Sequence, residues 1–145
     1  MTALLDVNVL LALAWPNHVH HRLALSWFEK CHAKGWATCS LTENGFVRIS
    51  SNAKVVDEAR TPVEAVLMLQ QLVSLEGHRF WQDDVSIARA DRVEIERIRG
   101  YRQVMDAHLV ALARRHDGRL ATFDRKIAGL LPRDVDPDRC IVVLS

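Results

Sequence analysis

The chain has 145 residues, of which 49% are hydrophobic and 26% are charged, and its formal net charge is +1. This length suits one folded domain over residues 1–145, and the composition excludes a disordered or fibrous chain. A net charge so close to zero predicts no strong attraction between the whole molecule and a polyanion. Any contact with nucleic acid must therefore come from a local patch.

Targeting signals and paired cysteines are both missing from the sequence. No apolar run approaches the roughly 20 residues that span a bilayer, and the N-terminus lacks the basic flank and cleavage site of a signal peptide. The cysteines Cys31, Cys39 and Cys140 are odd in number and widely spaced. They predict small buried thiols in a reducing compartment, without a disulfide framework or a zinc site. We therefore expect a cytoplasmic protein.

The first part of the chain alternates short apolar runs with helical patterns. The run Ala3–Leu5 predicts a fully buried strand of a parallel sheet, which ends at Asp6. After it we expect a short helix over Val9–Trp15 and a longer amphipathic helix over His18–Lys34. A second strand over Trp36–Cys39 and a third helix over residues 40–51 are expected to follow.

The rest of the chain continues this alternation. Thr61, Pro62 and Glu64 are typical of a helix start, and that helix is expected to run to about Glu76, with Gly77 closing it. Further helices are predicted over Ser86–Ile98 and Gln103–Asp117, and strands over Arg79–Gln82, Arg119–Phe123 and Cys140–Leu144. This order predicts an α/β protein, a three-layer α/β/α sandwich around a mainly parallel sheet of about five strands.

Four acids fall where such a sheet places its ligands. Asp6 and Asp124 each end a strand, Glu43 lies a few residues past another, and Asp106 is in the first turn of a helix. Clustered carboxylates raise one another's pKa unless a cation neutralises them. Oxygen-only ligands favour Mg²⁺ or Mn²⁺. Because G-x-S-x-G, Walker and G-x-G-x-x-G motifs are missing, the pattern favours metal-assisted hydrolysis of a phosphodiester.

Each acid also has a purely structural interpretation. Asp6 and Asp124 are suitable N-caps for the segments that follow them, and Glu43 is suitably spaced for a capping box with Ser40. Asp106 complements a helix dipole. For any single residue these interpretations are at least as good as a catalytic one. Four acids at one sheet edge favour a functional site, and capping is compatible with catalysis.

Two polar residues are second-rank candidates for the same site. For Asn8 there are two interpretations: it holds a metal-bound water or an acid, or it is the N-cap of the first helix. For Thr122 the two are that it orients an acid or a water, or that it is an ordinary β-branched strand residue. The spacing of His18, His20 and His21 does not match a metal motif, so a solvated surface is the preferred interpretation.

One stretch concentrates arginine, at positions 89, 92, 97, 99 and 102. Acidic residues interleave with it, which is typical of a salt-bridged, solvated face. Arg99 and Arg102 lie closest in sequence to Asp106, so they are the ones expected to contact RNA phosphates.

The four acids and their neighbours resemble a known family. Leu4-Leu5-Asp6-Val7-Asn8, Leu41-Thr42-Glu43, Met105-Asp106-Ala107-His108-Leu109 and Ala121-Thr122-Phe123-Asp124 resemble the motifs of the PIN domain, in order and over essentially the whole chain. The chain looks most similar to the VapC toxins of toxin–antitoxin modules. One departure is Asn8, where the wider family often has Ser or Thr.

The resemblance implies a parallel-sheet α/β/α fold and an endoribonuclease that depends on Mg²⁺, with Mn²⁺ as substitute. It carries over Asp6, Glu43, Asp106 and Asp124 as the catalytic acids, with Asp6, Asp106 and Asp124 as the metal ligands. It also implies a homodimer and a cognate antitoxin protein that inserts a peptide near the acidic cleft.

Two other classes of protein share some of these sequence features. A haloacid dehalogenase-like phosphatase or phosphotransferase also starts with strand–Asp-x-Asp, but Asn8 replaces the second acid and a later lysine motif is missing. A receiver-like binding module would use Asp6 for Mg²⁺ and a phosphate-accepting Asp at a mid-chain strand end, yet no such Asp–Lys pair stands out. The nuclease remains the preferred function.

Overall fold

The computed structural model describes residues 1–89, 91 and 93–145. Its five strands are parallel neighbours in the order β3-β2-β1-β4-β5, and their bounds are β1 Ala3–Leu5, β2 Trp36–Thr38, β3 His78–Phe80, β4 Arg119–Thr122 and β5 Ile141–Val143. This confirms the expected mainly parallel sheet. The chain winds from β1 in one direction to β3 and then returns to β4 on the other side of β1. Such a reversal opens a crevice outside the carboxyl ends of β1 and β4.

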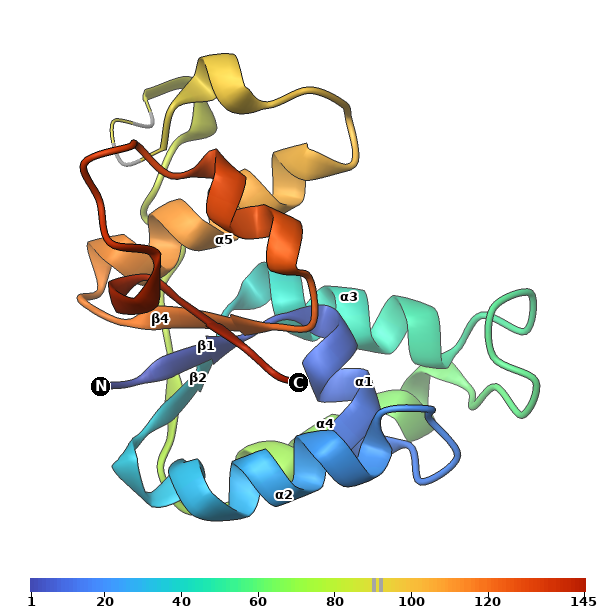
Figure 1. Cartoon of the computed structure of the whole chain (residues 1–145). Helices are drawn as coiled ribbons and strands as arrows, with labels where there is room; N and C mark the ends of the chain where they lie inside the picture. The colour runs from blue at the N-terminus through green and yellow to red at the C-terminus, as the bar shows by residue number, and fades with distance from the viewer. Residues whose placement is uncertain (90, 92) are drawn as a thin grey trace.

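Helices cover both faces of the sheet, so the predicted three layers are confirmed. Helix α5 (Gln103–Arg115) lies on one face, and the other face carries α1 Val7–Ala14, α2 His21–Cys31, α3 Ser40–Ser50 and α4 Pro62–Val73 (Figure 1). Strand β1 supplies both cores by ordinary alternation: Leu4 packs under α5, whereas Ala3 and Leu5 pack under the other helices.

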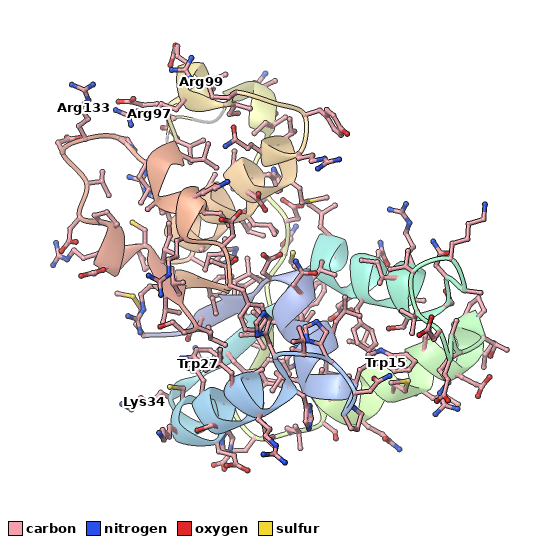
Figure 2. The ribbon with its side chains drawn as sticks, turned by 45° about the vertical axis from the view of Figure 1, so that its right-hand side comes forward. Trp15, Trp27, Lys34, Arg97, Arg99 and Arg133 are labelled. Carbon is pink, nitrogen blue, oxygen red and sulfur yellow. The ribbon has the colours of Figure 1, made fainter. Side chains whose placement is uncertain are left out.

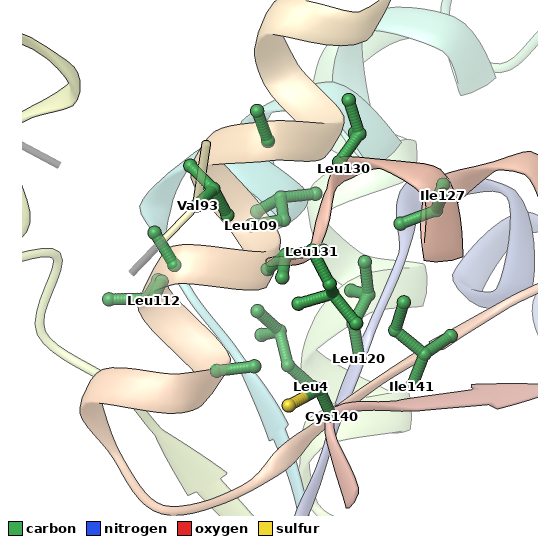
Figure 3. Packing of buried hydrophobic residues seen from close by; sticks show 14 of the residues in the cluster. Leu4, Val93, Leu109, Leu112, Leu120, Ile127, Leu130, Leu131, Cys140 and Ile141 are labelled. Atoms are coloured by element: carbon green, nitrogen blue, oxygen red, sulfur yellow. The ribbon is translucent and has the colours of Figure 1, made fainter. Parts of the chain in front are cut away.

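The core under α5 fixes the position of that helix over the sheet. Leu109 and Leu112 of α5 lie among buried side chains from β1, β4 and the segments that follow β4 (Figure 3). Burial of such leucines contributes about 1.5–3 kcal/mol each. The packing therefore holds the first turn of α5, which carries Asp106, beside the carboxyl edge of the sheet.

Local signals for the start of α4 and for the sharp turns are confirmed. The Thr61 hydroxyl accepts from the Glu64 N–H, and the Glu64 carboxylate accepts from the Thr61 N–H, each at 3.2 Å. Gly77 has φ +86°, and a Cβ there would lie 1.9 Å from the carbonyl oxygen of His32. Only glycine fits this turn, which comes directly before β3. Helix α4 itself ends at Val73, three residues earlier than predicted.

The predicted helix over Ser86–Ile98 is wrong for the described residues. The structure has two 3₁₀ helices instead, η2 Ile87–Arg89 and η3 Ile95–Arg97. The apolar residues Ile87, Val93 and Ile98 do not recur at helical spacing. Val93 is only 4% exposed and packs in the core under α5, so its burial, and not a helical stripe, accounts for this apolar residue. The predicted role of Arg92 in a salt-bridged face lies outside the described residues.

Other differences concern boundaries. Helix α2 begins at His21 and not at His18, because turns over residues 15–21 precede it, and a 3₁₀ helix, η1 His32–Lys34, follows it. The three cysteines are free; Cys39 and Cys140 are buried, as expected, whereas Cys31 is only half-buried. Among the described residues, no helix is long and apolar enough to cross a membrane.

Candidate active site

Asp6 lies at the junction between β1 and α1, where the chain leaves the sheet. Its Oδ1 accepts a hydrogen bond from the Val7 N–H at 2.7 Å, so Asp6 is the N-cap of α1. Its Oδ2 accepts from the hydroxyl of Thr122 at 3.0 Å. The structural interpretation is thus confirmed for Asp6, and the side chain is at the same time held at the crevice between β1 and β4.

Thr122 connects two of the acids. Its side chain is at the end of β4 and only 1% exposed. The Thr122 hydroxyl donates to Asp6 and accepts from the backbone N–H of Asp124 at 3.1 Å. Asp124 in turn accepts from the Lys126 N–H at 2.9 Å and caps the 3₁₀ helix η4 (Arg125–Leu130). The orienting role predicted for Thr122 agrees with these contacts.

The three aspartates act on one another electrostatically. Burial, then the charges of Asp6 and Asp124, raise the pKa of Asp106 to about 6. Burial also raises the pKa of Asp6, against hydrogen bonds from Thr122 and Val7 that lower it, and the charge of Asp124 adds to the rise. Asp6, Asp106 and Asp124, which we term the acid cluster, therefore lie close enough to repel. The sequence predicted this for all four acids, but Glu43 is not among the charges that raise the pKa of Asp6 or Asp106.

Glu43 has different partners. It is the fourth residue of α3, and its Oε2 accepts from the hydroxyl of Thr38 at 2.6 Å. The same hydroxyl is 2.8 Å from Nε2 of His78. Burial lowers the pKa of His78, while the charge of Glu43 opposes that shift. Glu43 therefore interacts with Thr38 and His78, whereas the three aspartates interact with one another.

The capping box predicted for Glu43 with Ser40 is wrong. The N-cap of α3 is Cys39, and Thr42 completes the box, because the Cys39 N–H donates to the Thr42 hydroxyl at 3.0 Å. The carboxylate of Glu43 is therefore not used to cap its own helix. Thr38 and His78 were not singled out from the sequence. The one signal for Thr38 was a polar residue at the end of an otherwise apolar strand.

The acid cluster has the chemistry of a site for a hard cation but not the shape of a closed cage. Within the described residues, no lysine, arginine or histidine forms an ion pair with Asp6, Glu43, Asp106 or Asp124. Nor does any group of three His, Cys, Asp or Glu side chains in that part of the chain form a ready metal site. Mg²⁺ commonly uses one or two carboxylates and keeps waters for its other positions. The repelling oxygen donors fit that kind of binding.

The lower-ranked residues lie around the cluster. Asn8 is exposed in the first turn of α1 and lines a cavity of about 380 Å³ together with Trp15 and His18. Arg99 is exposed, and so is Arg102, whose guanidinium lies 5.7 Å from the ring centroid of Tyr101. No hydrogen bond found among the described residues joins Asn8, Arg99 or Arg102 to an acid of the cluster.

A PIN domain family model matches residues 3–130, which include all four acids. The chain belongs to the PIN domain family. This PIN domain protein is 51% identical over 128 residues to Ribonuclease VapC39 of Mycobacterium tuberculosis, covering 88% of this chain and 92% of that protein. It is 52% identical over 122 residues to Ribonuclease VapC38 of the same organism, covering 84% of each chain. Ribonuclease VapC44 of that organism is 42% identical over 128 residues, 88% of this chain and 89% of its own. The protein is therefore a VapC-type member of a family that generally depends on divalent metal ions.

Proposed function

We propose that this protein is an endoribonuclease that hydrolyses RNA phosphodiester bonds at Asp6, Glu43, Asp106 and Asp124 and depends on a divalent cation. The observation that carries the proposal is the Thr122 hydroxyl, which donates to Asp6 and accepts from the Asp124 N–H at the carboxyl edge of the sheet. Asp106 lies close enough to both acids for their charges, together with burial, to raise its pKa to about 6. Repelling carboxylates at a crevice favour a cation, and strongly perturbed carboxyl groups are typical of functional sites. The VapC relatives, which are named ribonucleases, support RNA as the substrate.

Asp6, Asp106 and Asp124 are the proposed ligands of Mg²⁺, with Mn²⁺ as a substitute. A cation held there would lower the pKa of a bound water and would offset the negative charge that develops on the phosphoryl oxygens. The Val7 N–H and the Thr122 hydroxyl hold the Asp6 carboxylate in one orientation. A bound cation would favour the ionised form of Asp106, whose pKa is raised to about 6 by burial and by the charges of Asp6 and Asp124.

The remaining polar residues have supporting roles in this proposal. Glu43, held by the Thr38 hydroxyl, orients the attacking water or the substrate from the rim of the cluster. Thr122 positions Asp6 and Asp124. Asn8 offers an exposed amide beside the cap residue Asp6, and Arg99 and Arg102 contact RNA phosphates.

Membership of the PIN domain family favours the nuclease over the haloacid dehalogenase-like and receiver-like alternatives. We also propose that the protein is the toxin of a toxin–antitoxin pair, since its relatives are VapC proteins. A cognate antitoxin, a homodimer and a cytoplasmic location belong to this proposal. We further propose that residues 1–145 form one nuclease domain. The family match ends at residue 130, but β5 lies beyond it and pairs with β4, which is inside it.

Cleavage of total RNA by the wild type and by Asp6→Asn tests the proposed activity. We expect cleavage with Mg²⁺ or Mn²⁺, none in excess EDTA, and a loss of about 100-fold or more in the variant. Full activity in EDTA would refute metal-dependent hydrolysis. Stable phosphorylation of the protein by a small phosphodonor, without RNA cleavage, would instead support a phosphatase or receiver-like function.

A further inference from the structure

A groove beside the acid cluster is lined by basic side chains from separate segments. Its volume is about 400 Å³, and its lining includes Arg97, Arg99, Gln103, Lys126, Gly129 and Arg133. We term it the cationic groove. Arg97, Arg99 and Arg133 extend from neighbouring segments at one corner of the molecule (Figure 2). The walls are η3 with the following loop, the start of α5, and η4 with the residues after it.

The cations of this groove are not equivalent. Arg97 pairs with Glu94 and donates to the carbonyl oxygen of Gly129 at 3.3 Å, so it joins η3 to η4. Arg99, Lys126 and Arg133 are exposed, and none of them forms an ion pair with another described residue. The acidic residue in the lining is Glu96. The groove therefore carries an excess of unneutralised positive charge, although the net charge of the whole chain is only +1.

The cationic groove and the acid cluster share two structural elements. Gln103 in the groove and Asp106 in the cluster are three residues apart in α5, which is about 4.5 Å along the helix axis and places them on the same face. On the other wall, Lys126 follows Asp124 by two residues, and the Lys126 N–H donates to the Asp124 carboxylate at 2.9 Å. A polyanion in the groove would therefore extend directly to the acid cluster.

We infer that the cationic groove binds the phosphates of the RNA segment next to the bond that the acid cluster cleaves. This inference rests on the proposed function and adds Lys126 and Arg133 to the substrate site. Exposed guanidinium and ammonium groups without ion partners are suited to phosphate oxygens. They also supply local attraction for a polyanion that the nearly neutral molecule lacks as a whole.

The test compares two double variants that remove the same amount of charge. Arg99→Gln with Arg133→Gln alters the groove, and Lys30→Gln with Lys34→Gln is the matched control. Both lysines are exposed and form no ion pair with a described residue. They lie near the amino end of β2, far from the groove, and Lys34 marks this region in Figure 2. Affinity for a single-stranded RNA oligonucleotide is measured in EDTA, over a range of salt concentrations.

We expect the groove variant to bind RNA about tenfold or more weakly. Its plot of log affinity against log salt should flatten by about 1.4, since each lost phosphate contact removes about 0.7 for a single strand. The control, Lys30→Gln with Lys34→Gln, should match the wild type. Arg99→Lys with Arg133→Lys keeps the charges and should therefore keep the wild-type slope. Equal losses in both glutamine variants, or no loss in either, would overturn the inference, as would RNA binding too weak to detect in the wild type.

Cleavage with Mg²⁺ separates this inference from the proposed function. For the groove variant we expect a higher KM at a nearly unchanged kcat, because the groove binds substrate away from the reacting atoms. If the wild type cleaves RNA but the groove variant binds it with the wild-type slope, only the groove assignment fails. If the wild type binds RNA through the groove but never cleaves it, the proposed activity fails.

Discussion

The Thr122 hydroxyl donates a 3.0 Å hydrogen bond to Oδ2 of Asp6, although the two residues are 116 positions apart in the chain. Parallel pairing of β1 with β4 makes this contact possible, because the register sets Leu5 beside Ala121 and so brings the next residues together. The same hydroxyl accepts from the Asp124 N–H. A single buried threonine therefore orients acids at the ends of two strands.

Replacing this hydroxyl should reduce activity without removing any acid. We expect Thr122→Val to lower the RNA cleavage rate about 10- to 100-fold, as loss of a residue that supports a ligand commonly does. Thr122→Ser keeps the hydroxyl and should retain most of the rate. The measurement is metal-dependent cleavage by both variants. Equal rates for valine and wild type would mean that the contact with Asp6 has no role in activity.

Asp106 should destabilise the metal-free protein at neutral pH. Its folded pKa of about 6 exceeds the ordinary 3.8, so the folded state holds the proton more tightly than the unfolded chain does. The proton on Asp106 therefore stabilises the folded state. This contribution to the free energy of unfolding is fully present below about pH 3.8 and is lost as the pH rises through about 6. In EDTA, Asp106→Asn should therefore melt above the wild type at pH 7.5, with a smaller difference at pH 4.5.

The control for that measurement is Asp134→Asn, an exposed acid outside the cluster. Thermal melts of the three proteins at both pH values give the comparison. A constant difference between Asp106→Asn and the wild type at the two values would contradict the repulsion. The charge of Asp106 in the first turn of α5 works in the opposite direction, but it contributes only about 0.3–1 kcal/mol.

Metal binding should reverse the cost of the repulsion. A cation that binds only the folded state adds about 2.7 kcal/mol to the free energy of unfolding at a hundredfold excess over its dissociation constant. We expect Mn²⁺ or Mg²⁺ to raise the melting temperature of the wild type at pH 7.5 and to leave Asp6→Asn nearly unchanged. An equal rise in both proteins would show that the ion binds elsewhere.

Glu43 should be less sensitive to loss of charge than Asp106. Its carboxylate is bound to Thr38, and Gln in its place keeps an oxygen that accepts from that hydroxyl. We expect Glu43→Gln to reduce cleavage about tenfold and Asp106→Asn about 100-fold or more. Parallel rate measurements at a saturating Mg²⁺ concentration decide this. The reverse order would place Glu43, and not Asp106, at the reacting centre.

A toxin should act on its host through the same acids. We expect expression of the wild type alone to slow growth of a bacterial host, and expression of Asp6→Asn to leave growth unaffected. Growth curves at equal soluble levels of the two proteins provide the test. Equal growth would count against a toxin while leaving the nuclease chemistry intact.

Some features follow directly from local sequence, because their causes lie within a few residues. The buried run Ala3–Leu5 specifies a central strand, and Asp6 after it both caps a helix and stands at the sheet edge. The capping box of Thr61 and Glu64 and the turn at Gly77 are equally local. The alternation of such segments was enough to predict the parallel sandwich, with Asp6 and Asp124 just after two of its strands.

Only the tertiary structure decided how the acids differ. Sequence treats Glu43 and Asp106 alike, yet burial and the charges of Asp6 and Asp124 raise the pKa of Asp106, while the Glu43 carboxylate accepts from Thr38. Likewise, the burial of Val93 under α5 is a contact between distant segments. The cationic groove joins segments about 30 residues apart, such as Arg99 and Arg133. These properties come from contacts between distant segments and from the loss of water around them, which no local pattern encodes.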